Sequence, residues 1–109
     1  MANHRISIKN RLLQSIVNGS KQLEIRPESQ RHCLIQVGST ITFFSSEKEI
    51  RCRVSEVNRY KNLDEAVTEE KAQLLGPGYK RHQVINAIQG FYPRWNGAYL
   101  VFQITVVDN

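Results

Sequence analysis

The 109-residue sequence has few of the residue types that cross-link small domains or hold metal ions. It contains only two cysteines, Cys33 and Cys52, and neither belongs to a Cys-x-x-Cys pair. Its three histidines, His4, His32 and His82, are scattered without the spacing of metal ligands. We therefore expect no disulfide framework, no metal and no cofactor. Cys52 lies within an alternating apolar pattern, which predicts a small buried core residue.

Long apolar runs are also missing. No stretch approaches the length of about 20 residues that spans a bilayer, and the first five residues lack the apolar core of a signal peptide. We therefore expect a cytoplasmic protein with no membrane partner. A chain of this length with 40% hydrophobic residues can bury one core. Residues 1–109 are accordingly predicted to form a single domain, which we take to be a monomer.

Acidic residues are outnumbered by basic ones. The chain has 15 Lys plus Arg against 10 Asp plus Glu, a formal net charge of +5. Arginine exceeds lysine, and its planar guanidinium suits bidentate contacts with phosphates and bases. This charge is compatible with a polyanionic partner such as RNA, although many small basic domains bind none.

Hydrophobic periodicity predicts about five strands and three helices. The strands are expected at residues 4–8, 22–26, 40–44, 50–60 and 99–107, and the helices at 11–18, 63–75 and 83–89. Asn10 and Asn62 are expected to cap the first two helices, and glycines to follow all three. The alternation of inward apolar and outward polar residues shifts by one position at Val57, which predicts a β-bulge near Ser55 and Glu56.

The arrangement of these elements predicts the fold class. Strands spaced at hairpin distance favour a mixed or antiparallel sheet that closes on itself. The class is therefore α+β, a small mixed β-barrel with flanking short helices.

Charges concentrate in one stretch beside apolar residues. Within residues 18–26, Lys21, Glu24 and Arg26 lie among Val17, Leu23 and Ile25. Charges at the edge of a core interact strongly because they are partly desolvated. Because alternate residues of a strand point to the same face, Glu24 and Arg26 share one face, and Lys21 follows the turn at Gly19. This stretch is the leading candidate for a functional site.

Residues 19–26 resemble the GxKxxExR signature of ASCH domains, a branch of the PUA-like superfamily. Residues 37–43, 54–66 and 97–104 resemble further segments of that family in the same order, with Ser39 where an Asp is usual. The resemblance covers nearly the whole chain. It implies a small β-barrel with a cleft, lined by the Lys-Glu-Arg motif, that holds RNA or a nucleotide-like ligand.

One bacterial branch of the family hydrolyses acetylated cytidine with a Lys of this motif, a Thr three residues later and a more distant Glu. Lys21 matches the Lys, but Glu24 stands where the Thr would be, and Leu75 aligns with the distant Glu. The activity is therefore not carried over, and enzymatic function is left open with a preference for binding alone. The alternative is a small hydrolase of the acetylcytidine amidohydrolase or ribonuclease type, with Lys21 as its catalytic group.

The candidate ligand-binding residues are the motif and a set of aromatic and basic residues expected at the rim of the cleft. They are Lys21, Glu24, Arg26, Tyr60, Tyr79, Lys80, Arg81, Arg94 and Trp95. Aromatic and basic side chains together suit single-stranded nucleic acid. Other interpretations remain: Lys21 as a structural residue, Glu24 with Arg26 as a plain ion pair, and Trp95 as ordinary loop packing.

Overall fold

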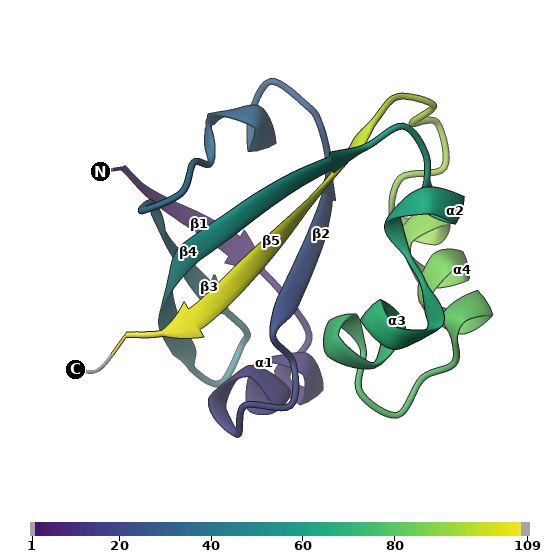
Figure 1. The fold of residues 1–109 in the computed structure, drawn as a ribbon. Helices are drawn as coiled ribbons and strands as arrows, with labels where there is room; N and C mark the ends of the chain where they lie inside the picture. Colours follow the sequence, from purple (N-terminus) through teal and green to yellow (C-terminus); the bar gives the residue numbers. More distant parts are fainter. Residues whose placement is uncertain (1, 108–109) are drawn as a thin grey trace.

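Five strands form one mixed sheet in the order β1-β3-β4-β5-β2 (Figure 1). The computed structural model describes residues 2–107. The strands span Asn3–Ser7 (β1), Leu23–Pro27 (β2), Thr40–Phe44 (β3), Glu49–Tyr60 (β4) and Tyr99–Val106 (β5). β1 runs parallel to β3, and the other three pairings are antiparallel. The predicted class is confirmed as a five-stranded mixed half-barrel, with β1 and β2 as its two edges.

Short helices flank this sheet. They span Asn10–Val17 (α1), Leu63–Ala66 (α2), Glu69–Leu75 (α3) and Arg81–Phe91 (α4), and a 3-10 turn covers His32–Leu34. Figure 1 shows α2, α3 and α4 gathered on the β2 side of the sheet, with α1 below it. No helix in the described range is long and apolar enough to cross a membrane.

The core has two parts, one on each side of the strands. Inside the half-barrel lie Ile6, Ile41, Phe43, Cys52, Val54 and Phe102 with their neighbours. Between the sheet and α2 to α4 lie Ile25, Leu63, Ala66, Leu75, Val84, Ile88 and Val101. Cys52 is fully buried as predicted, and this burial raises the pKa of its thiol to about 11. It is therefore a core residue rather than a reactive one.

Several local predictions are confirmed. The register of β4 against β5 shifts between Val54 and Glu56, which places the bulge at Ser55. The side chain of Asn62 accepts a hydrogen bond from the Glu65 backbone N–H at 2.9 Å, as an N-cap does. Gly19 has φ +86°, the left-handed conformation that ends α1.

The prediction of one helix over 63–75 is wrong. The backbone is extended at Val67 and Thr68, and a new helix, α3, begins at Glu69. The Thr68 hydroxyl accepts a hydrogen bond from the Lys71 backbone N–H at 3.1 Å. A β-branched valine followed by a threonine favours this arrangement, because the threonine side chain satisfies the backbone better as a cap than in a helix interior.

Two other helix ends differ from prediction. Asn10 is the first residue of α1 rather than its cap, and its side-chain oxygen accepts a hydrogen bond from the Ser45 hydroxyl at 3.1 Å. α4 begins at Arg81 and runs through Gly90, since the Tyr92 backbone N–H still reaches the Ile88 carbonyl at 3.1 Å. An exposed glycine weakens a helix without ending it. The strand ends lie within two residues of prediction, and Pro27 is the last residue of β2 rather than its stop.

The segment from Glu28 to Gln36 buries His32. The Nδ1 atom of His32 lies 3.1 Å from the Pro27 carbonyl and 3.0 Å from the Ser29 hydroxyl. Burial lowers the pKa of His32, and the nearby positive charge of Arg26 lowers it further. The folded protein therefore favours the neutral imidazole.

We expect acid to destabilise the protein through His32 as the pH falls below 6.5. Because its folded pKa lies below the unfolded value of 6.5, stability is complete above that pH. It falls as the pH drops toward the folded pKa, by at most about 1.4 kcal/mol per pH unit. Urea unfolding at several pH values measures this slope. His32→Asn keeps an N–H near the Nδ1 position and should flatten the slope, whereas His82→Asn, at an exposed position, should not. Equal slopes in all three proteins would contradict the assignment.

Candidate functional site

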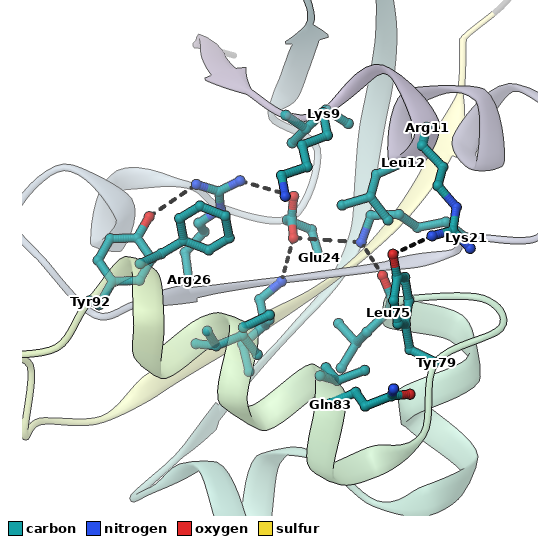
Figure 2. A pocket seen from close by; sticks show the side chains of 17 residues that line it. Lys9, Arg11, Leu12, Lys21, Glu24, Arg26, Leu75, Tyr79, Gln83 and Tyr92 are labelled. Carbon is teal, nitrogen blue, oxygen red and sulfur yellow. Dashed lines mark hydrogen bonds and ion pairs between the residues drawn. The ribbon is translucent and has the colours of Figure 1, made fainter.

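A pocket of about 380 Å³ opens along the free edge of β2, between α1 and α4 (Figure 2). β2 pairs only with β5, so one edge of the strand faces the pocket. Leu12 from α1 lines one wall, and Val84 and Ile88 from α4 line the other. Three charged residues of β2 and the turn before it, Lys21, Glu24 and Arg26, lie at its floor, which we call the charged floor.

Lys21 is held by three acceptors. Its Nζ donates to the Leu23 carbonyl at 2.6 Å and to the Leu75 carbonyl at 2.7 Å, and lies 3.6 Å from Glu24 Oε1. The residue is 3% exposed. Burial lowers its pKa and Arg26 adds to this effect, while Glu24 opposes it. Two of the three N–H bonds of the ammonium group are thus taken up by backbone carbonyls, and the Glu24 carboxylate lies within ion-pair distance.

Glu24 joins the two cations. Its Oε1 accepts from the Ile25 backbone N–H at 3.0 Å, and its Oε2 accepts from Arg26 Nη2 at 3.2 Å. Burial alone would raise the pKa of this carboxyl, but the charges of Lys21 and Arg26 outweigh it and hold the pKa below its usual value. Glu24 is therefore ionised at neutral pH.

Arg26 connects the charged floor to the end of α4. Its Nη1 donates to the Tyr92 hydroxyl at 3.0 Å, and its Nη2 donates to Glu24. Burial lowers the pKa of Arg26, but Glu24 and Tyr92 more than compensate and raise it. A guanidinium has five N–H bonds, and these two contacts leave others for a ligand.

The backbone explains why these residues meet. Gly19 turns the chain out of α1, and the Lys21 backbone N–H then bonds to the Ser15 carbonyl at 2.9 Å. Along β2, Lys21 covers the free carbonyl of Leu23, and Glu24 covers the free N–H of Ile25. Unpaired backbone groups on an edge strand need such partners when they are buried.

Cations and aromatic rings surround the mouth of the pocket. Arg11 hydrogen-bonds the Tyr79 hydroxyl and stacks over its ring at 4.6 Å from the centroid. The Lys9 ammonium lies 6.0 Å from the centre of the Phe91 ring. Phe91 is 67% exposed although it is a large apolar residue. Among residues 2–107, Glu24 is the only acidic residue that lines this pocket, against four basic ones.

The structure brings four of the predicted site residues together: Lys21, Glu24, Arg26 and Tyr79. Sequence analysis did not identify Lys9, Arg11, Gln83, Phe91 and Tyr92, which also line the pocket. Their signal in the sequence is weak. Tyr92 is 66 residues from its partner Arg26, and only the tertiary fold brings the two together.

Five predicted site residues lie outside this pocket, and their ligand contacts remain predictions. The Tyr60 hydroxyl accepts a hydrogen bond from Lys71. Arg81 bonds to the Asp64 carboxylate at 2.8 Å. The remaining three are Lys80, Arg94 and Trp95; the first two are exposed, and the third packs within the loop before β5.

No group of three potential metal ligands comes together in residues 2–107. The pocket offers a buried network with an excess of positive charge, aromatic side chains, and apolar walls above it.

Comparison with solved structures identifies the fold as that of ASCH domains, as the sequence predicted. An ASCH domain from Lactobacillus crispatus superposes with a TM-score of 0.74 at 16% identity, over 94% of this chain and 79% of that one. A protein from Pyrococcus furiosus superposes with a TM-score of 0.75 at 18% identity, over 98% of this chain and 99% of that one. ASCH from Zymomonas mobilis superposes with a TM-score of 0.62 at 12% identity, over 97% of this chain and 67% of that one. No protein-family model and no curated protein matches the sequence.

We expect the charge of Glu24 to be essential for stability. Glu24→Gln keeps an acceptor for the Ile25 N–H but leaves Lys21 and Arg26 buried without a counter-charge. Loss of one partner of a buried ion pair costs about 3–5 kcal/mol. Urea denaturation at pH 7 measures the change.

The matched control is Glu28→Gln, which breaks the more exposed ion pair with Arg59. That substitution should cost less than about 1 kcal/mol. A similar loss in both variants would show that Glu24 does not compensate the buried cations.

Proposed function

We propose that this protein binds a nucleotide, or one nucleotide unit of RNA, in the pocket above the charged floor, and that residues 1–109 act as one domain. The observation that carries the proposal is the convergence of aromatic rings and basic groups on a pocket where Glu24 is the single carboxylate among the described residues. Nucleotides combine an aromatic base with an anionic phosphate, so they match both features.

The size of the pocket suits one such unit. A volume of about 380 Å³ falls in the range of roughly 300–1,000 Å³ that is typical of small-molecule sites. A duplex would not enter it, whereas an unpaired base with its sugar is of suitable size. Phe91 at the mouth is exposed and available for stacking on the base.

Charge gives the ligand an orientation. Lys9 and Arg11 at the mouth, together with the remaining N–H groups of Arg26, attract a phosphate. Glu24 Oε2 accepts from Arg26 alone among the contacts of the described residues. Its second lone pair suits an amino group on the base edge.

The contacts of Lys21 favour binding over hydrolysis. To act as a base or nucleophile, Lys21 would have to be neutral and turn a lone pair toward the substrate. Its three contacts direct its protons to two carbonyls and to Glu24 instead. The pKa of Lys21, lowered by burial, is the one observation that favours the second candidate, a nucleoside or RNA hydrolase.

We expect nucleoside monophosphates to bind more tightly than the corresponding nucleosides, because the phosphate meets the basic mouth. The double substitution Lys9→Gln with Arg11→Gln should weaken AMP and UMP binding about tenfold or more, with a smaller effect on adenosine and uridine. Titration calorimetry at 50 mM salt measures both. Binding of an RNA pool should also weaken as salt is raised.

The matched control is Lys48→Gln with Arg51→Gln, which removes the same charge from exposed positions outside the pocket. It should change nucleotide affinity by less than about twofold. An equal loss in both double variants would mean that net charge alone attracts the ligand. Binding of RNA no tighter than that of a neutral polysaccharide would refute the proposal.

The hydrolase alternative makes a different prediction. It requires that the native protein forms a hydrolysis product from acylated nucleosides or RNA, and that the Lys21→Met variant forms none. The circular dichroism spectrum of that variant must match the native one. Absence of product from the native protein would leave binding as the function.

A further inference from the structure

A second pocket, of about 460 Å³, shares Tyr92 with the pocket above the charged floor. It is formed by the turn between β4 and α2, the end of α4, and the loop that leads into β5. The hydroxyl of Tyr92 accepts a hydrogen bond from Arg26. The two pockets therefore have one lining residue in common, and its side chain is held by the charged floor.

Tyr99 gives this pocket a hydroxyl without a partner among the described residues. The residue is 4% exposed, lines the pocket, and begins β5, where it pairs with Tyr60 on one side and Pro27 on the other. Its ring is buried but its hydroxyl is not fully enclosed, and partial burial raises its pKa. A hydroxyl that lines a pocket and makes no hydrogen bond within residues 2–107 is available to a ligand.

Trp95 gives the pocket a fixed aromatic surface. Its indole N–H donates to the Ala98 carbonyl at 2.9 Å. The ring packs so closely on Gly97 that a Cβ there would lie 2.9 Å from it. An aromatic ring held in place by its own packing loses little entropy when a base stacks on it.

The remaining lining suits the edge of a nucleobase. The exposed amides of Gln89 and Asn96 each carry both donors and acceptors, and Lys61 supplies a positive charge. No acidic residue in the described part of the chain lines this pocket. Amides with a stacking ring are the groups that read unpaired bases.

We propose that the second pocket holds the next nucleobase of a single-stranded oligonucleotide whose first nucleotide occupies the pocket above the charged floor. The linking phosphate then crosses Tyr92, beside the guanidinium of Arg26. This inference rests on the proposed function and narrows its ligand to a chain of at least two nucleotides. It also gives a ligand-binding role to Trp95, which lies outside the first pocket.

The test compares dinucleotides with mononucleotides. The probes are pUpU against UMP and pApA against AMP, titrated by calorimetry and followed by fluorescence. Trp95 is the only tryptophan in the chain, so its emission reports on the second pocket alone. We expect the dinucleotides to bind about tenfold or more tightly than the mononucleotides and to quench Trp95. A second stacked base contributes about 1–3 kcal/mol, which corresponds to that gain.

Tyr99→Phe supplies a variant that keeps the buried ring and removes only the unpartnered hydroxyl. It should weaken dinucleotide binding roughly three- to tenfold, the usual effect of one hydrogen bond, and leave UMP and AMP binding unchanged. Ser55→Ala is the control. Its hydroxyl donates to the Gln103 carbonyl outside both pockets, and its loss should change neither affinity.

The outcomes separate this inference from the proposed function. If UMP and AMP bind in the manner proposed but pUpU and pApA bind no more tightly, the second pocket takes no base and the inference alone fails. It also fails if Tyr99→Phe leaves dinucleotide affinity unchanged. If neither mononucleotides nor dinucleotides bind, both proposals fail together.

Discussion

The compensation of two buried cations by Glu24 is the interaction on which the site depends. Lys21 and Arg26 lose their hydration beside the apolar residues of β2, and this desolvation is costly unless a counter-charge and hydrogen bonds replace the water. Glu24 supplies both, and its own pKa is held low by the cations that it serves. None of the three residues would be stable at its position without the others.

The same contacts place the walls of the pocket. Lys21 bonds to the carbonyl of Leu75, the last residue of α3, and thereby fixes that helix to the start of β2. Arg26 bonds to Tyr92, directly after α4. The charged floor therefore sets the distance between strand and helices as well as the local field. Stability and ligand recognition share residues here, so substitutions at the mouth of the pocket are more informative about binding than those at its floor.

Sequence reasoning identified the features whose cause is local. Gly19, Asn62 and the bulge at Ser55 follow from backbone conformation, capping and parity, each of which involves a few neighbouring residues. The motif residues were found because charges among apolar neighbours are unusual in any fold. The order of strands in the sheet is harder to predict from the sequence, because the parallel pairing of β1 with β3 depends on contacts between distant segments.

Prediction from the sequence failed where contacts between distant residues determine the structure, or where two local conformations are closely balanced. The break at Val67 and Thr68 interrupts residues that individually suit a helix, and a single hydroxyl cap is part of what ends it. Tyr92 carries no sequence mark that would link it to Arg26. Trp95 was expected at the rim of one cleft, but it lines another, because the short loop before β5 turns it against Gly97.

A half-barrel differs from a closed barrel in having two edges, and the β2 edge is closed by side chains rather than by another strand. Lys21 and Glu24 occupy the carbonyl and N–H groups that a further strand would use. Exposed strand edges are templates for chain-to-chain pairing. Lys21 and Glu24 thus block the pairing of another strand at these two backbone groups, and the same residues shape the pocket.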